Sequence, residues 1–184
     1  MMKTLWLIGG PMGVGKTTAC RLMQQRLPRC AFLDGDWCWD IRPFAVTEET
    51  KAMVMDNIVH LLRGYLACTA VEHVVFCWVM HQQAILDDLL TRLPLEGVRV
   101  NTLSLVCTEE ELIRRLQRDV DAGLRQADVI PRSLERLQHY ASLNTRRLDG
   151  TRLTPAETAE ALLRIGAKAS AAQDVTASGR SCGA

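Results

Sequence analysis

Several features that would direct the protein to a particular environment are absent from the sequence. No stretch approaches the ~20 consecutive apolar residues of a membrane-spanning helix. The segment after Lys3 has neither the length nor the small-residue cleavage site of an export signal. Basic and acidic side chains nearly cancel, leaving a formal net charge of +1, so no broad basic surface for duplex nucleic acid or anionic lipid is indicated. These absences favour a cytoplasmic protein that meets any polyanion only locally.

Cysteine is present, but not in a pattern that builds a covalent or metal framework. The seven cysteines are odd in number, none forms a C-x-x-C pair, and most lie in apolar runs such as VVFCWV around Cys77. We therefore expect small buried side chains in a reducing compartment rather than disulfides or a zinc site. The histidines His60, His73 and His139 also lack the spacing of metal ligands and receive no role.

Short apolar runs alternate with longer stretches of helical period along the chain. This alternation is typical of βαβ units around a parallel sheet. A chain of 184 residues fits one domain, which we place at residues 1–166. Residues 167–184 are small and polar without period, which predicts a flexible C-terminal tail. Candidate strands lie at 4–8, 30–33, 73–79, 98–106 and 147–149, and candidate helices at 16–27, 48–67, 82–93, 109–122, 131–142 and 155–165.

Two of these helices begin with a sequence typical of a capping box. Thr108 and Thr154 are each followed three residues later by a glutamate, Glu111 and Glu157. We expect the hydroxyl and the carboxylate of each pair to bond the other's free backbone N–H group.

The sequence GPMGVGKT follows the first predicted strand and matches the P-loop pattern G-x-x-x-x-G-K-[ST] in full. Its glycines allow backbone N–H groups to turn inward, so the loop and the following helix N-terminus can hold a triphosphate. Lys16 is then expected to reach the β- and γ-phosphates, and the Thr17 hydroxyl to ligate Mg²⁺. A simple glycine-rich turn is the alternative. The residues predicted to bind the nucleotide here are Gly10, Pro11, Met12, Gly13, Val14, Gly15, Lys16, Thr17 and Thr18.

Two aspartates, Asp34 and Asp36, follow the second predicted strand within LDGDWCWD. Parallel strands place their carboxyl ends at one edge of the sheet, so we expect both acids beside the P-loop. The third strand, VVFCWVMH, offers no acid for this purpose. If the chain stays extended through Gly35, both carboxylates point to the same side, where one orients a metal's water shell and the other positions or deprotonates a hydroxyl. The acids could instead cap backbone groups of a turn.

The P-loop, the D-x-D of Asp34 and Asp36, and the run RLQRD followed by Arg125 resemble shikimate kinase and its relatives among the nucleoside-monophosphate-kinase-like small-molecule kinases. The resemblance covers most of residues 3–166. It implies a three-layer α/β P-loop NTPase fold with a five-stranded parallel sheet in the order 2-3-1-4-5. It also implies that Asp34 supports Mg²⁺ and that Asp36 holds the phosphoryl-accepting hydroxyl. The family's glycine triplet on the third strand is replaced here by CWVMH.

A short segment at about 122–131 resembles the lid of such kinases. Arg125 lies beside a glycine in this segment and is expected to close over the transferred phosphoryl group, where a mobile arginine contributes strongly to the rate. By the resemblance, Arg115 stacks on adenine and Arg118 touches phosphate. The alternative is a solvated basic helix face paired with nearby glutamates, which we favour for Arg114.

An acceptor pocket is expected between the acid pair and the end of the third strand. Trp37 and Trp39 follow the acids, and Trp78 and His81 lie at the strand end. In the expected strand order these loops are neighbours, so the tryptophans can wall in a ring or sugar. Each tryptophan could equally serve in packing, and a lone histidine is more often a structural hydrogen-bonding group.

Together these features predict an ATP-dependent kinase that uses Mg²⁺ and phosphorylates a hydroxyl of a small molecule. A nucleoside or nucleotide kinase and a 5′-hydroxyl nucleic-acid kinase are alternatives, although the balanced charge disfavours nucleic acid. A regulatory nucleotide-binding switch ranks lower, because the sequence has no N-K-x-D signature.

Overall fold

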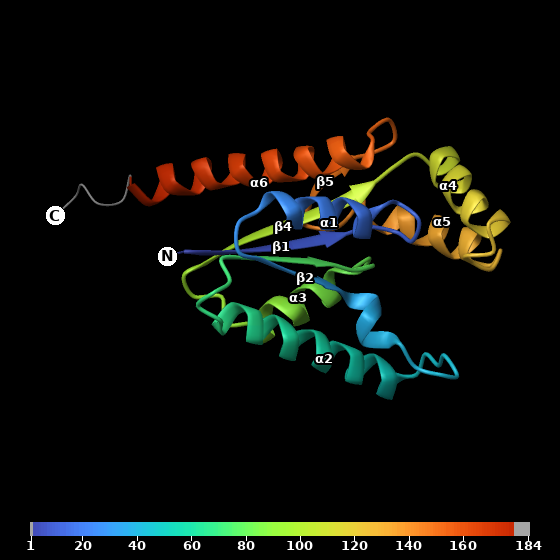
Figure 1. Cartoon of the computed structure of the whole chain (residues 1–184), viewed down its shortest axis with the longest axis horizontal. Helices are drawn as coiled ribbons and strands as arrows, with labels where there is room; N and C mark the ends of the chain where they lie inside the picture. Colours follow the sequence, from blue (N-terminus) through green and yellow to red (C-terminus); the bar gives the residue numbers. More distant parts are fainter. Residues whose placement is uncertain (1, 179–184) are drawn as a thin grey trace.

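The computed structural model describes residues 2–178, in which a central parallel sheet is flanked by helices (Figure 1). The sheet has the strand order β2-β3-β1-β4-β5, and all of its pairings are parallel. The predicted α/β P-loop fold and its strand order are therefore confirmed. The strands are β1 (Lys3–Gly9), β2 (Cys30–Asp34), β3 (His73–Cys77), β4 (Val98–Val106) and β5 (Arg146–Asp149).

The helices follow the predicted ranges, with differences mainly at their ends. They are α1 (Lys16–Arg26), the 3₁₀ helix η1 (Gly35–Trp39), α2 (Glu48–Ala67), α3 (Gln83–Arg92), α4 (Glu109–Asp121), α5 (Val129–His139) and α6 (Pro155–Ser178).

Several boundaries differ from the sequence prediction, among them the end of α5, which lies at His139 rather than at residue 142. Strand β3 ends at Cys77 rather than at residue 79, because its register partners on β1 and β2 are Ile8 and Asp34 and the paired part of the sheet ends there. Helix α5 begins at Val129, two residues before the predicted start. Helix α6 runs to Ser178 instead of residue 165, through an alanine-rich stretch that favours helix. Residues 179–184 of the predicted tail lie outside the described residues, and the flexibility of the tail stays a prediction.

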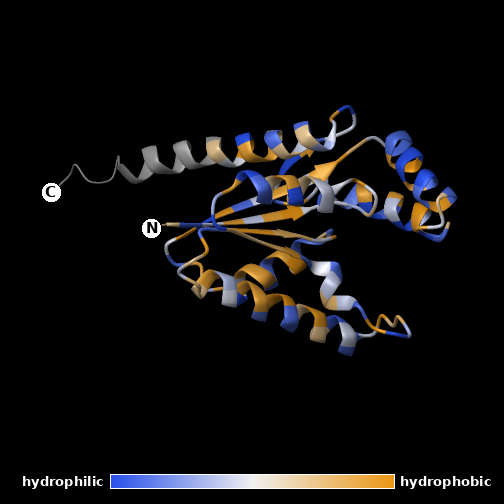
Figure 2. Ribbon diagram, in the orientation of Figure 1, coloured by the Kyte–Doolittle hydropathy of each residue, from blue (hydrophilic) through white to orange (hydrophobic). Residues whose placement is uncertain are grey.

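The central strand β1 shows how the layers are assembled. Its side chains alternate between the two faces of the sheet, as strand geometry requires. Leu5 and Leu7 belong to a buried cluster with α2 and α3, whereas Trp6 and Ile8 belong to a second cluster with α1 and α6. The apolar strands therefore lie between two helical layers whose outer faces are more hydrophilic (Figure 2).

Helices α4 and α5 form a smaller unit beyond the carboxyl edge of the sheet (Figure 1). A third buried cluster joins Leu112 and Leu116 of α4 to Val129 at the start of α5 and to Val14 of the P-loop. This packing fixes the predicted lid region against the phosphate loop.

The two predicted capping boxes have different outcomes. At the start of α6 the box is complete, since Thr154 N donates to Glu157 Oε2 at 2.8 Å and Glu157 N donates to Thr154 Oγ1 at 3.3 Å. At the start of α4 only half forms, because Glu111 N bonds the Thr108 hydroxyl at 3.3 Å while the Glu111 carboxylate accepts from arginines instead. The capping box predicted at Thr108 and Glu111 is therefore only half formed.

None of the helices in residues 2–178 combines the length and apolar character needed to cross a membrane.

Candidate active site

The P-loop connects β1 to α1 in a conformation that requires glycine. Gly13 has φ +80° and Gly15 has φ +101°, which L side chains rarely adopt. A Cβ atom on Gly13 would also overlap the Leu116 side chain of α4. The loop therefore depends on small residues both for its own path and for its packing against α4.

Lys16 is enclosed by the loop that precedes it. Its Nζ atom donates to the carbonyl oxygens of Gly10 at 2.8 Å and Pro11 at 2.9 Å. Burial lowers the pKa of Lys16, and the nearby carboxylates of Asp36 and Asp34 act in the opposite direction. The ammonium group is thus held inside the phosphate loop, with both acids close enough to affect its charge.

Asp34 ends β2 and is buried directly against the P-loop helix. Its Oδ2 atom accepts from the Thr17 hydroxyl at 2.6 Å, and its Oδ1 atom accepts from the backbone N of Asp36 at 3.1 Å. The first bond joins the two predicted metal ligands, and the second caps η1. Both roles that the sequence left open for Asp34 are therefore observed: its carboxylate lies beside the P-loop and also caps the turn that follows β2.

The expected extended path through Gly35 was wrong, because the chain enters the 3₁₀ helix η1 immediately after Asp34. Gly35 is required there, since a Cβ atom would overlap the Trp78 side chain. In a 3₁₀ helix the side chains at i and i+3 lie on the same face. Asp36 and Trp39 therefore share one face, while Trp37 projects elsewhere.

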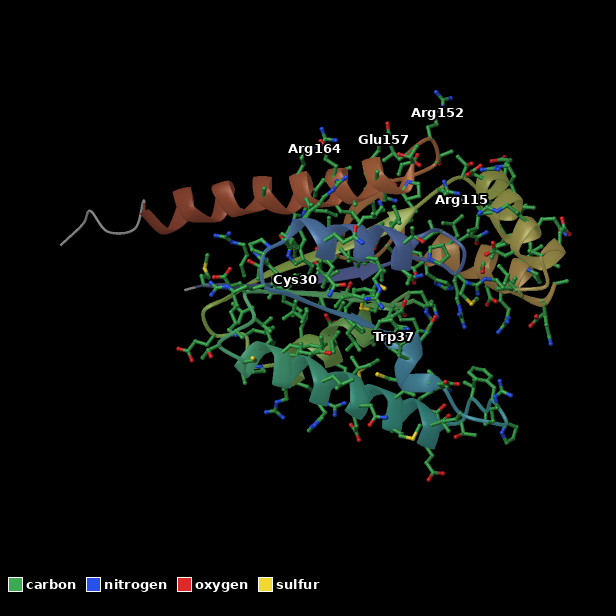
Figure 3. All side chains as sticks on the ribbon, viewed as in Figure 1. Cys30, Trp37, Arg115, Arg152, Glu157 and Arg164 are labelled. Carbon is green, nitrogen blue, oxygen red and sulfur yellow. The ribbon has the colours of Figure 1, made fainter. Side chains whose placement is uncertain are left out.

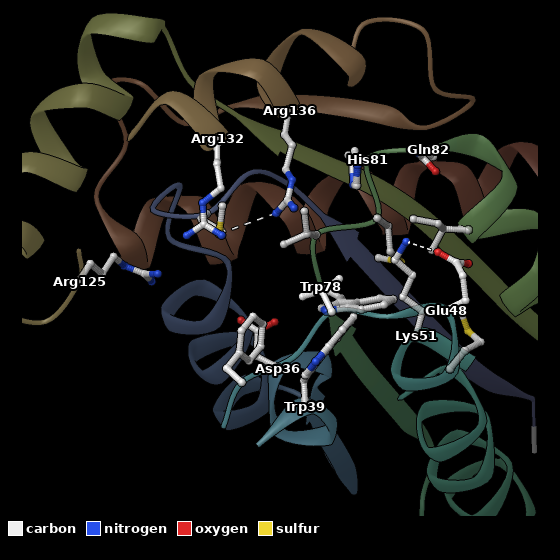
Figure 4. Close-up of a pocket in the computed structure, with 17 residues that line it drawn as sticks. Asp36, Trp39, Glu48, Lys51, Trp78, His81, Gln82, Arg125, Arg132 and Arg136 are labelled. Carbon is white, nitrogen blue, oxygen red and sulfur yellow. Dashed lines mark hydrogen bonds and ion pairs between the residues drawn. The ribbon is translucent and has the colours of Figure 1, made fainter. Parts of the chain in front are cut away.

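The Asp36 carboxyl group faces a large cavity of about 790 Å³ (Figure 4). Burial raises the pKa of Asp36, and the Asp34 charge adds to this shift. Lys16, Arg125 and a hydrogen bond from Trp78 lower it. A carboxylate with a raised pKa in a cleft is a candidate proton acceptor.

Most of the predicted acceptor-site residues line this cavity. Trp39, Trp78 and His81 do so together with Asp36 and Arg125. Burial, with Arg136 and His139 nearby, lowers the pKa of His81, which favours its neutral form.

Trp37 does not line the larger cavity, so its predicted place there was wrong. Its ring meets Phe32 edge to face at 5.4 Å, and the Arg21 guanidinium lies 4.9 Å from its centre. The side chain lies beside η1 (Figure 3) and is 50% exposed. The physical reason is the three-residue turn of η1, which separates positions 37 and 39.

Several cavity residues were not identified from the sequence. Arg132 and Arg136 of α5 extend into the cavity (Figure 4), and their i, i+4 spacing on one helix face was a signal that could have found them. Arg132 pairs with Asp128 at 3.0 Å, whereas Arg136 contacts the Met12 sulfur at 3.8 Å. The buried Tyr140 was also missed, and its hydroxyl donates to the Val79 carbonyl at 2.7 Å beside the cavity wall.

A second, smaller cavity of about 410 Å³ lies on the other side of the P-loop. Its lining includes Thr18 and Gly15 of the P-loop region, Arg115 and Arg118 of α4, and the turn before α6. Arg115 is held in place by Glu111 Oε1 at 2.6 Å and by the carbonyl oxygens of Val14 and Gly150, each at 2.9 Å. This arginine therefore joins α4, the P-loop and the turn before α6 (Figure 3).

The arginine of the predicted lid segment lines the larger cavity. Arg125 lies in the connection between α4 and α5, next to Gly123 with φ +70°. Its Nε atom bonds Asp119 at 3.3 Å, and it lines the larger cavity. Arg114 instead pairs with Glu111 on the exposed helix face, at 2.7 Å and 2.8 Å.

The fold and this site define a P-loop domain of the kind that holds nucleotide phosphates. The chain belongs to the AAA domain family, which it matches over residues 7–128. A comparison with curated proteins finds no match.

Several solved structures have the same fold. A tunicamycin resistance protein from Deinococcus radiodurans is 20% identical, with a TM-score of 0.64 over 90% of this chain and 95% of that one. A gluconokinase from Sinorhizobium meliloti is 18% identical, with a TM-score of 0.62 over 91% and 95%. The shikimate kinase from Acinetobacter baumannii is 19% identical, with a TM-score of 0.57 over 90% and 93%. The predicted resemblance to small-molecule kinases of this fold is thus confirmed.

Proposed function

We propose that the protein is an ATP-dependent kinase that transfers the γ-phosphate to a hydroxyl group of a small-molecule acceptor in the cytoplasm. The position of the two aspartates carries this proposal. Asp34 bonds Thr17 of the P-loop at 2.6 Å, while Asp36 faces the larger cavity. Kinases named among the structures of the same fold support the assignment.

The residues around Thr17 fit a bound Mg²⁺ ion. This ion prefers oxygen ligands and usually takes one or two protein groups beside substrate phosphates and water. The Thr17 hydroxyl and the Asp34 carboxylate are adjacent oxygen groups of this kind, and they would hold it directly or through its waters. When bound, Mg²⁺ supplies charge compensation to the phosphate oxygens.

The chain's own residues divide the remaining work. Asp36 accepts the proton of the acceptor hydroxyl as that oxygen bonds to the γ-phosphorus and the bond from phosphorus to the bridging oxygen breaks. Lys16 exchanges its carbonyl partners in the loop for the β- and γ-phosphates. Arg125 breaks its ion pair with Asp119 and stabilises the equatorial oxygens of the transferred phosphoryl group.

The smaller cavity is assigned to the nucleotide. Thr18 and the P-loop backbone face it, and Arg118 lines it with no hydrogen-bonding partner among the described side chains. Arg115 already bonds three groups, so its role is to form the wall against which adenine packs.

The proposal is tested by measuring ADP release with and without a panel of sugars, sugar acids, cyclitols, nucleosides and aryl alcohols. A kinase releases ADP faster with at least one compound and forms one phosphorylated product per ADP. A regulatory nucleotide hydrolase would release ADP at one rate whatever compound is added. Lys16→Ala serves as the control for contaminating kinases.

A further inference from the structure

Both charged and aromatic side chains line the larger cavity. Asp36, Arg125 and Arg136 are among the charged ones, whereas Trp39 and Trp78 form part of an apolar wall (Figure 4). A hydroxyl group that reaches Asp36 therefore belongs to a molecule whose remainder meets an apolar surface.

Aromatic side chains form the centre of this wall. The ring of Trp39 lies 6.3 Å from Trp78 and 6.0 Å from Phe44, with tilts of 42° and 38°. Met55 and Ile85 continue the apolar lining, and both pack against the buried core between the sheet and α2 and α3. Tilted aromatic faces at these separations favour a flat ring that stacks or packs edge to face.

The wall is fixed in position by hydrogen bonds of the loop after η1. The Trp39 indole Nε1 atom donates to the Ala45 carbonyl at 3.2 Å, and the Thr50 hydroxyl donates to the same oxygen at 3.0 Å. These bonds use the polar atom of Trp39, so its ring faces the cavity as an apolar surface. The loop between Trp39 and α2 is thereby tied to both elements.

Two apolar side chains at the rim of the cavity remain uncovered. Phe44 is 65% exposed and Val46 is 56% exposed, although both line the cavity. They flank the anchored Ala45 carbonyl. An apolar ligand group would remove their surface from water, which is favourable.

We infer that the acceptor is an alcohol that carries an aryl group or a similar flat apolar ring system. Its hydroxyl lies at Asp36 and its ring lies against Trp39, Trp78 and Phe44. The volume of about 790 Å³ falls within the range of about 300–1,000 Å³ found for drug-sized ligands. This inference rests on the proposed kinase function, since Asp36 defines where the hydroxyl lies.

The first experiment compares acceptors that differ only in the ring. Phenyl-1,2-ethanediol, its cyclohexyl counterpart and glycerol are tested as acceptors together with glucose and gluconate, by ADP release and by ³¹P NMR of the product. The aryl diol is expected to have the highest kcat/KM, followed by the cyclohexyl diol. A sugar or sugar acid with an equal or higher kcat/KM would overturn the inference while leaving the kinase function intact.

The second experiment uses variants of the wall. Trp39→Ala and Phe44→Ala are each expected to raise KM for the aryl diol about tenfold with KM for ATP unchanged, and Trp39→Phe should retain most of the affinity. Trp37→Ala is the matched control from the same 3₁₀ helix and is expected to change neither constant. Equal effects of Trp37→Ala and Trp39→Ala would contradict the assignment.

A binding measurement separates the inference from the proposed function. The dimethyl ether of the aryl diol has no transferable proton, so calorimetry with it tests the wall alone. Binding that is weakened by Trp39→Ala supports the aromatic site even if no compound is phosphorylated. Absence of binding by both the diol and its ether would overturn the site whether or not the protein is a kinase.

Discussion

The two cavities beside the P-loop differ in how far their side chains are already satisfied. In the smaller cavity Arg115 bonds a carboxylate and two carbonyl oxygens, which joins three parts of the chain. In the larger cavity Phe44 and Val46 are exposed, and desolvation of its carboxyl group raises the pKa of Asp36. On the nucleotide side Arg115 therefore links three segments of the chain, whereas on the acceptor side Phe44 and Val46 present apolar surface that a ligand would cover. Substitutions should separate the two sides.

The largest effect is expected at Lys16 of the P-loop. Lys16→Ala should lower kcat by more than about 10³-fold, because it removes the cation that faces the transferred phosphoryl group. Steady-state ADP release with a working acceptor measures this loss. Lys3→Ala is the control, since its ammonium bonds the Cys68 and Val71 carbonyls at the amino end of β1. Substantial turnover by Lys16→Ala would contradict the role of the P-loop lysine in phosphoryl transfer.

Arg125 tests whether the lid acts on the acceptor side. Arg125→Ala should lower kcat by about 10³-fold, the lower part of the range for an arginine that stabilises phosphoryl transfer, with little change in KM for ATP. Arg63→Ala is the control, because Arg63 is exposed on α2, lines neither cavity and should leave kcat unchanged. A loss of ATP affinity equal to the loss of kcat would instead place Arg125 with the nucleotide.

The pH dependence of kcat tests Asp36 as the proton acceptor. Desolvation and the Asp34 charge raise the pKa of Asp36 above its ordinary 3.8, so the active carboxylate is lost at a higher pH than for an unperturbed aspartate. Activity should fall as the pH drops through this raised pKa. Asp36→Asn should be about 10²-fold slower at neutral pH and should lack this acid limb. An unchanged acid limb in Asp36→Asn would assign the titration to another group.

The smallest effect concerns the stability of the nucleotide side. Hydrogen bonds from Arg114 and Arg115 lower the pKa of Glu111 from 4.5 to about 2. Because the folded state favours the carboxylate, its stabilising contribution is present above pH 4.5 and is lost as the pH falls toward 2. The difference in unfolding free energy between wild type and Glu111→Gln should therefore shrink over this interval. Urea unfolding at several pH values measures this difference.

Local sequence patterns were sufficient to predict a parallel sheet and the phosphate loop, whereas the strand order was implied by the resemblance to shikimate kinase and its relatives. Apolar runs defined the strands, and the P-loop match located the first βα junction, where the glycine conformations confirm the need for small residues. The position of Asp34 beside Thr17 followed from the common edge of parallel strands. The right-handed crossovers and the parallel direction of the strands were enough to place Asp34 at the same edge of the sheet as the P-loop.

The remaining features depend on contacts between distant segments. The 3₁₀ turn after Asp34 is accommodated because Trp78 packs against Gly35, and it sends Trp37 away from the cavity. The Glu111 carboxylate does not cap the Thr108 backbone, because it accepts a hydrogen bond from Arg115, which also bonds the Val14 and Gly150 carbonyl oxygens. These outcomes follow from tertiary packing, which a local sequence pattern does not encode.

The division of labour between the two aspartates is tested most directly by calorimetric titration of ATP at several Mg²⁺ concentrations. Asp36→Asn should bind ATP with near wild-type affinity at every Mg²⁺ concentration. Asp34→Asn should bind ATP more weakly and need more Mg²⁺ to recover, because the Thr17 side of the site loses its carboxylate. Equal losses of nucleotide affinity in both variants would contradict the account.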